Sequence, residues 1–273
     1  MTKIKSDTSK TEIIGSEIKR LVNLKGSDNW AKTRSSDNFK LVEKTYPFGK
    51  RLCYEKINID NDYIDLQSSR GIGIEENDVL ENVLSRIEDL MRIIESDEVR
   101  ISEIDNIFQH PKLKISDLKH TGFVELGFRI PRLMKYYADH FNVPVWGYDV
   151  APLSLEVTKQ MGYDARQYDF NNCGGDLGLG GASLVVSYHM LEHLSDPPSA
   201  IKRIFEAMDK GSFFHVEVPI EPGVPRLNYG HMFAFHENDL GAFLNLIGFE
   251  VLTKSNCTHH DGPLIERYMA RKP

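Results

Sequence analysis

Short apolar runs alternate with helix signals from about residue 120 to the end of this 273-residue chain. Each run is short and bounded by turn residues, so we predict seven strands. They are Phe123–Leu126, Val143–Asp149, Ala165–Asp169, Ser183–Tyr188, Ser212–Pro219, Phe249–Asn256 and Ile265–Ala270. Strand–helix alternation over about 150 residues is typical of a parallel, doubly wound sheet. The fold class is therefore predicted to be α/β.

Prolines and glycines mark the expected ends of the intervening helices. Pro131 and Pro152 stand where a first helical residue is expected, and Asp196 precedes Pro197 as a helix N-cap. Three glycines follow helical segments in the position favoured for a left-handed cap: Gly162, Gly211 and Gly248.

The first part of the chain has a different pattern and predicts a smaller α+β region. Residues 52–66 alternate apolar and polar side chains around an Asp60-Asn61-Asp62 turn, which predicts a β-hairpin. Apolar residues recur at helical spacing from Val79 to Ile94, which predicts one helix packed on the chain or on a second subunit. We place the domain boundary near residue 115, between regions 1–115 and 116–273.

Composition and charge narrow the class of protein. The 33 Lys and Arg and 40 Asp and Glu residues give a net charge of −7, although residues 1–56 are locally basic. The acidic total argues against a nucleic-acid partner. Three cysteines without a CxxC pair argue against a disulfide framework and a cysteine zinc site. Without an apolar run of about 20 residues or a secretory signal, we expect a cytoplasmic protein with no membrane partner.

Three predicted strand ends carry residues whose spacing suits a nucleoside. Gly127 follows the first strand, Asp149 closes the second strand 22 residues later, and Asp169 closes the third. Ligands of doubly wound sheets bind beyond the carboxyl ends of the strands, and an acid about 20 residues after the first turn hydrogen-bonds ribose hydroxyls. Asp169 is placed to accept a hydrogen bond from an adenine amine. Each acid alone is also an ordinary cap or turn residue, but together they favour a nucleoside site.

Two longer segments carry a family resemblance. They are LVVSYHMLEHLSDPPSAIKRIFEAMDKGSFFHVEVP (184–219) and HMFAFHENDLGAFLNLIGFEV (231–251). With the final ERYMARK strand, they resemble class I S-adenosylmethionine-dependent methyltransferases of the "LEHL-D-P" type over residues 115–273. The resemblance implies a Rossmann-like, doubly wound, seven-stranded sheet with a C-terminal antiparallel hairpin. It also implies S-adenosylmethionine as cofactor and O-methylation of a small molecule or glycan, with residues 1–115 as an acceptor lid or a homodimer contact.

The resemblance also implies which residues hold the cofactor. Glu125 and Gly127 match the first motif, Asp149 the ribose acid and Asp169 the acid on the adenine side. Neighbouring positions at the same strand ends complete the expected cofactor set: Arg129, Val150, Phe170 and His189.

The first motif departs from the family pattern. Where the family has an acid followed by G-x-G-x-G, this chain has ELGFRIP from Glu125 to Pro131, with only the first glycine present. These glycines let the loop backbone approach the cofactor without Cβ atoms in the way. We favour retained binding, with Arg129 paired to the methionine carboxylate of the cofactor. The alternative is a non-catalytic binding or regulatory protein with a changed cofactor loop.

Histidines are concentrated after residue 188. His189, Glu192 and His193 form an H-x-x-E-H string, but a zinc-peptidase motif of this form needs a continuous helix, and here a turn is predicted. The Glu192-His193 pair also resembles a pair that helps to hold a divalent cation in small-RNA 2′-O-methyltransferases. With His189, and with His231 or His236 as a further ligand, this gives a metal site as the alternative. A metal-free site is our prediction, because the same turn resembles that of many methyltransferases without a metal.

The expected chemistry needs a base. A methyl group moves from a sulfonium by in-line displacement, so the protein positions the acceptor and removes its proton. Histidine suits this role near neutral pH. We assign His193 as the general base and His231 as a base or as the residue that orients the acceptor.

Overall fold

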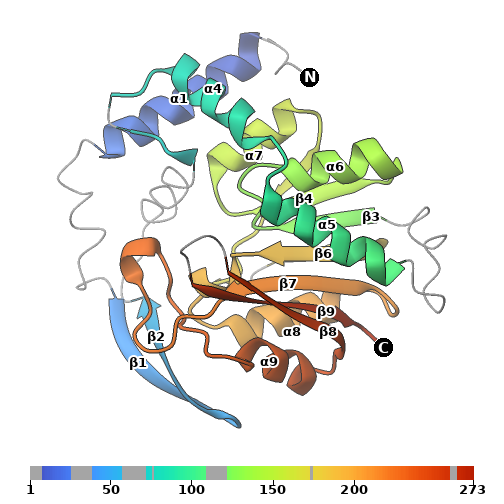
Figure 1. Cartoon of the computed structure of the whole chain (residues 1–273). Coiled ribbons are helices and arrows are strands. Elements are labelled where there is room, and N and C mark those ends of the chain that lie inside the picture. The colour runs from blue at the N-terminus through green and yellow to red at the C-terminus, as the bar shows by residue number, and fades with distance from the viewer. Residues whose placement is uncertain are drawn as a thin grey trace.

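The structure is a computed structural model that describes residues 8–25, 39–56, 72–75, 77–108, 122–172, 175–258 and 263–273 (Figure 1). Its centre is a seven-stranded sheet with the strand order β5-β4-β3-β6-β7-β9-β8. The strands are β3 (Gly122–Leu126), β4 (Val145–Asp149), β5 (Asp164–Gln167), β6 (Ala182–Tyr188), β7 (Phe213–Pro219), β8 (Glu250–Thr258) and β9 (Leu264–Arg271). Strands β3 to β7 are parallel, and β9 runs antiparallel between β7 and β8. The predicted Rossmann-like sheet with a C-terminal antiparallel hairpin is confirmed.

Helices cover both faces of this sheet, because successive side chains of each strand enter different cores. On one face α5 (Glu95–Phe108), α6 (Arg132–Phe141) and α7 (Pro152–Gln160) pack near Leu184 and Val186 of β6. On the other face α8 (Pro197–Ala207) and α9 (Asp239–Ile247) pack near Val185 and Val216. Figure 1 shows these two groups of helices on opposite sides of the sheet. Burial on both faces explains why the central parallel strands β3, β6 and β7 are largely apolar runs in the sequence.

The helix ends follow the sequence signals with two differences. Helix α7 begins at Pro152, and α8 begins after Asp196, whose side chain accepts from the Ser199 amide at 3.4 Å. Helix α6 begins at Arg132, so Pro131 precedes the first helical position instead of occupying it. Gly248 caps α9 and Gly162 follows the end of α7, both with positive φ. Gly211 also has a positive φ, but it belongs to the turn before β7 and not to the end of α8.

The described residues contain an N-terminal hairpin that begins before the predicted one. Strand β2 (Gly49–Lys56) pairs with β1 (Phe39–Tyr46), so residues 52–56 pair with the strand before them. The turn is made by residues 47–48 and Gly49. Gly49 has a φ of 128°, which glycine adopts readily because it has no Cβ atom. The predicted turn at Asp60-Asn61-Asp62 lies outside the described residues. Cys53 of β2 is fully buried in the main core, and the Tyr54 amide donates to the Met232 carbonyl at 2.7 Å.

The single helix predicted from Val79 to Ile94 is wrong at its C-terminal end. Helix α4 (Leu80–Leu90) stops earlier, and α5 begins at Glu95. Acidic side chains in the first turn of α5 favour a new helix N-terminus there, and the Asp97 carboxylate accepts from the Ile94 amide at 3.3 Å. Helix α1 (Thr8–Lys25) packs with α4 and α7 in a third apolar core.

The predicted boundary near residue 115 falls within residues 109–121, which lie outside the description, and it stays a prediction. The described N-terminal elements contact the Rossmann-like part: α1 packs on α7, the hairpin on the core beside α9, and α5 on the sheet. Within the described ranges, no helix combines the length and the hydropathy that crossing a bilayer requires.

Candidate active site

A cavity of about 580 Å³ lies at the carboxyl ends of β3, β4 and β6. The chain places β4 and β5 on one side of β3, and β6 and β7 on the other. Such a switch in strand order is where doubly wound sheets bind ligands. All ten residues that the sequence proposed for the cofactor and for catalysis line this cavity: Glu125, Gly127, Arg129, Asp149, Val150, Asp169, Phe170, His189, His193 and His231. Their individual roles remain predictions.

The loop after β3 keeps a left-handed backbone despite its missing glycines. Gly127 has a φ of 70°, and a Cβ atom on it would lie 2.6 Å from Cγ of Met190. Arg129 has a φ of 47°, a conformation that glycine adopts most easily. The Arg129 amide donates to Oδ2 of Asp149 at 2.9 Å. This bond ties the loop to the end of β4 and stabilises the strained residue.

Replacing Gly127 with alanine is expected to destabilise the protein by about 1–3 kcal/mol through backbone strain, and further through overlap with Met190. Gly162→Ala is the matched control, because its φ is 94° and no atom lies within 4 Å of the added Cβ. Urea unfolding of both variants separates the free-energy cost of backbone strain, which both share, from the cost of overlap with Met190, which only Gly127→Ala has. Equal losses in the two variants would show that Met190 adjusts freely and that the loop tolerates a side chain.

Asp149 connects the first two strand ends. Its Oδ2 accepts from Arg129 and its Oδ1 accepts from the Ala151 amide at 2.8 Å. Burial raises the pKa of Asp149, although these amides oppose the shift. An ionised carboxylate has about four acceptor positions, so two amides leave capacity for ribose hydroxyls.

The third strand end meets a residue that the sequence did not single out. Oδ1 of Asp169 accepts from the Asn171 amide at 2.8 Å. Lys56, the last residue of β2, lines the same cavity. Burial lowers the pKa of Lys56, and the Asp169 carboxylate partly opposes this shift. Only the packing of the hairpin brings Lys56 here, so no local sequence signal marks it.

A carboxyl group and a guanidinium beside the first loop fit a zwitterionic ligand. Glu125 is 8% exposed, and burial raises its pKa to about 8 although Arg132 opposes this. Among the described residues, its Oε2 has no hydrogen-bond partner. The exposed Arg129 guanidinium also makes no hydrogen bond or ion pair within the described part of the chain. With the Cβ-free position at Gly127, these groups fit the amino-acid end of S-adenosylmethionine.

His189 is held between two buried carboxylates. Its Nε2 lies 2.8 Å from Oε1 of Glu217, and its Nδ1 lies 3.3 Å from Oε1 of Glu192. Burial lowers the pKa of His189, but the two carboxylates outweigh it and raise the pKa to about 9. At neutral pH His189 is therefore an imidazolium and has no free lone pair for a proton or a cation.

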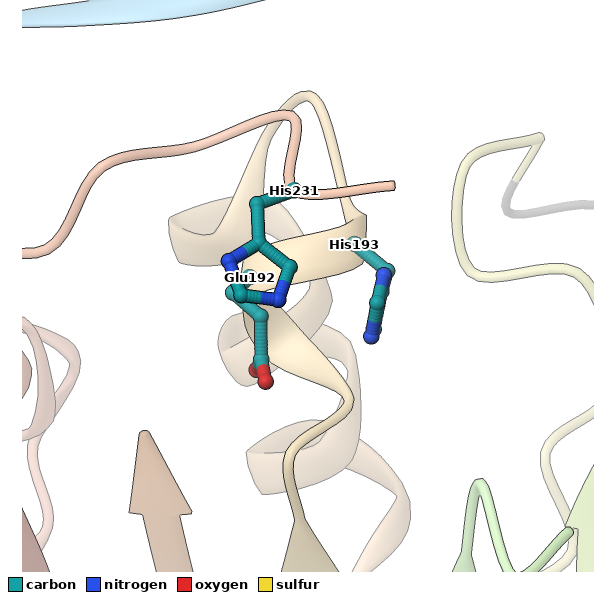
Figure 2. Close-up of side chains that lie close together, drawn as sticks. All are labelled: Glu192, His193 and His231. Carbon is teal, nitrogen blue, oxygen red and sulfur yellow. The ribbon is translucent and has the colours of Figure 1, made fainter. Parts of the chain in front are cut away.

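Glu192, His193 and His231 form the second cluster in the cavity (Figure 2). One ligand atom from each residue lies within 4.8 Å of the other two. Glu192 and His193 belong to the short 3₁₀ turn η3 (Leu191–His193), and His231 lies in the segment after β7. The H-x-x-E-H string therefore does not form a continuous helix, as expected from the sequence.

Both histidines of this cluster are oriented through Nδ1. Nδ1 of His193 lies 3.0 Å from the Gly230 carbonyl, and Nδ1 of His231 lies 2.6 Å from Oε2 of Glu221. These partners are hydrogen-bond acceptors, so each Nδ1 carries a proton, and in a neutral ring the lone pair is on Nε2. The sequence identified both histidines but missed Glu221, because the pairing joins residues ten positions apart in an irregular segment.

A buried ionic network supports the floor of the site. Glu217 of β7 is fully buried and pairs with Arg100 of α5, with Arg267 of β9 at 2.5 Å, and with His189. Glu103 extends the network by pairing with Arg267 at 2.8 Å. This arrangement fixes α5 and the strand ends beside the cavity.

The fold is the α/β Rossmann-like fold of class I methyltransferases. It is similar to the structure of a proposed sarcosine dimethylglycine methyltransferase from Galdieria sulphuraria, with a TM-score of 0.51 and 11% identity over 72% of this chain and 89% of that chain. The structure of the [4+2]-cyclase SpnF gives a TM-score of 0.49 and 14% identity over 59% of this chain and 80% of that chain. A proposed methyltransferase from Bacillus halodurans gives a TM-score of 0.48 and 13% identity over 63% of this chain and 99% of that chain. No protein-family model and no curated protein sequence matches the chain. At 11% identity the likeness to the Galdieria sulphuraria structure shows the fold alone, so the reaction is argued from the site.

Proposed function

We propose that the chain is an S-adenosylmethionine-dependent O-methyltransferase that acts on a small molecule or sugar. The observation that carries this proposal is the single cavity in which strand-end acids, the Arg129 loop and two oriented histidines meet. The volume of about 580 Å³ is in the range of cofactor and small-ligand sites. When bound, S-adenosylmethionine supplies an electrophilic methyl group.

Each part of the cavity then has a role. Asp149 accepts from the ribose hydroxyls, Asp169 holds the adenine side, and Arg129 pairs with the cofactor carboxylate. His193 takes up the acceptor proton at Nε2, and His231 is a second base or orients the acceptor. Lys56 lines the cavity, and this contact supports the proposal that residues 1–115 form a lid over the site. A homodimer contact is the other role proposed for this region.

Binding of the cofactor is the first test. Calorimetry of purified protein with S-adenosylmethionine and S-adenosylhomocysteine is expected to show one site per chain, and mass spectrometry of co-purified nucleosides checks the same point. Absence of binding to both compounds would contradict the proposal.

His193→Ala is expected to lower turnover about 100-fold and to leave cofactor affinity nearly unchanged, because the side chain takes a proton and does not hold the donor. Release of S-adenosylhomocysteine with a panel of hydroxylated small molecules and sugars measures turnover. His236→Ala is the control, since His236 lies outside the cavity lining and Nε2 of its ring accepts from the Gly223 amide at 3.4 Å. Equal turnover in wild type and His193→Ala would remove the base assignment.

The second candidate is a non-catalytic binding or regulatory protein. The observation that favours it is the loop from Phe128 to Pro131, where side chains replace two glycines of the family pattern. Such a protein would bind a partner or nucleoside without methyl transfer to any member of the acceptor panel.

A further inference from the structure

We propose that Glu192, His193 and His231 bind one divalent transition-metal cation. The proposal rests on the arrangement of these three side chains in the cavity (Figure 2). It deepens the proposed function, on which it depends only for the role of the cation and not for the binding itself.

Glu192 is the strongest indication of a missing ligand. Its side chain is 1% exposed, and neither carboxylate oxygen has a hydrogen-bond partner among the described residues. His189 lies at an ion-pair separation of 3.3 Å but outside hydrogen-bond geometry. A buried carboxyl group without hydrogen-bond donors is costly, so a further partner for its oxygens is expected at this position.

The two histidines are prepared as metal ligands. Neutral imidazoles bind a cation through one nitrogen while the other N–H donates to a carboxylate or backbone carbonyl. Glu221 accepts from His231 and the Gly230 carbonyl accepts from His193, at 2.6 and 3.0 Å between the paired atoms. Both Nε2 atoms are thus left for a cation, and the Glu221–His231 pair has the carboxylate–histidine arrangement that fixes ring orientation in metal sites.

The ligand set indicates the chemical class of the cation. Two imidazole nitrogens and one carboxylate oxygen suit zinc, iron, cobalt or manganese better than calcium or magnesium, which prefer oxygen ligands. Neighbouring ligands of a tetrahedral zinc ion lie about 3.4 Å apart when each bond is about 2.1 Å long. The three side chains, now within 4.8 Å of one another, need to move inward by about 1 Å.

His189 is excluded from this ligand set. Both of its nitrogens face carboxylates, Glu217 at 2.8 Å and Glu192 at 3.3 Å. We assign it as a positioning residue that keeps the Glu192 carboxylate beside the two neutral histidines. Of the residues considered from the sequence, the structure thus brings together Glu192, His193 and His231.

The cation has a clear role in O-methylation. Three protein ligands leave coordination positions on the cavity side, where an acceptor hydroxyl is bound and acidified. With the cation bound, the Nε2 lone pairs of His193 and His231 are used as ligands, so the cation acidifies the hydroxyl and the proton passes to water. The imidazoles act as bases only in the metal-free protein. The cofactor residues around Asp149 and Asp169 remain unaffected.

Metal binding to the full chain tests the proposal directly. After dialysis against Co²⁺, Zn²⁺, Mn²⁺ or Mg²⁺, wild-type protein is expected to hold about one equivalent of a transition metal and to prefer it to Mg²⁺. The bound Co²⁺ is expected to give the intensified visible absorption of a nitrogen-containing, low-coordinate site. Glu192→Gln and His231→Ala are expected to lose this binding, and Glu221→Gln to weaken it about 10- to 100-fold. His236→Ala is the control and is expected to bind like wild type.

Three results would overturn the proposal: no stoichiometric metal in wild type, equal metal in wild type and both ligand variants, or a preference for Mg²⁺. The Co²⁺ spectrum of wild type stays decisive if a variant fails to fold. Titration with S-adenosylhomocysteine is done in parallel on metal-free protein. Cofactor binding without metal binding would overturn only the cation, whereas metal binding without cofactor binding would overturn only the methyltransferase proposal.

Discussion

Replacing Asp149 with alanine is expected to weaken the binding of S-adenosylmethionine about 10²- to 10⁴-fold. Two charge-assisted hydrogen bonds to ribose hydroxyls contribute about 1.5–3 kcal/mol each, and both are lost together with the carboxylate. The variant also removes the acceptor of the Arg129 and Ala151 amides, so the loop after β3 loses its tie to β4. Both effects lower cofactor affinity. Calorimetry with S-adenosylhomocysteine measures the change.

Two further variants separate these effects. Asp149→Asn keeps one carbonyl oxygen that can accept from a backbone amide, but it removes the negative charge. We therefore expect this variant to keep the loop after β3 in place and still to lose cofactor affinity. Asp164→Ala is the control, because this residue pairs with Arg166 at the protein surface, where their side chains are 51% and 45% exposed. Unchanged affinity in folded Asp149→Ala would show that the acid at the end of β4 does not bind the cofactor.

The sheet could be predicted from the sequence because each strand and the turns at its ends are marked by residues close together in the chain. Each central strand is buried on both faces, so it is a short apolar run, and turn residues mark its ends. The N-terminal hairpin shows the limit of this reasoning. The alternating pattern of residues 52–56 is compatible with pairing to an earlier or to a later strand. In the structure these residues pair with β1, across the turn at residues 47–48.

The positions of the candidate site residues could also be predicted, because strand ends of a parallel sheet meet at one edge. Asp149, Asp169 and His189 reach the cavity for this reason. The state of each group could not be predicted. His189 is an imidazolium because Glu217 and Glu192 flank it, and these contacts join residues of β7 and the η3 turn.

Helix α5 was missed for a different physical reason. Its inward side is not an apolar stripe, since the buried Asp97 and Arg100 lie there beside Ile101 and Ile104. Reading hydrophobic periodicity assumes that buried positions are apolar. Helix α5 faces the sheet with charged side chains, so it does not fit this assumption. The burial of Arg100 is explained only by Glu217, which lies opposite it in the folded chain and also pairs with Arg267.

The second large effect is expected in this ionic network. Glu217→Gln should lower the free energy of unfolding by about 3–5 kcal/mol, because it removes the anion shared by buried Arg100, Arg267 and His189. Burial raises the pKa of Glu217, but its contacts with His189 and Arg100 outweigh this and keep the pKa well below its ordinary value. The stabilising contribution is therefore present above the unfolded pKa of about 4.3 and is lost as the pH falls through the folded value. Urea unfolding at neutral pH consequently measures the whole effect.

The same substitution at the surface provides the control. Glu43 pairs with Lys50 in the N-terminal hairpin, and their side chains are 50% and 65% exposed. Glu43→Gln is expected to change the free energy of unfolding by less than about 1 kcal/mol, because solvent screens an exposed pair and ordering its side chains costs entropy. A similar small change in Glu217→Gln would mean that Asp97 and Glu103 alone compensate the two arginines. The network would then be divisible into pairs, and Glu217 would not be the group that fixes α5 and His189 beside the cavity.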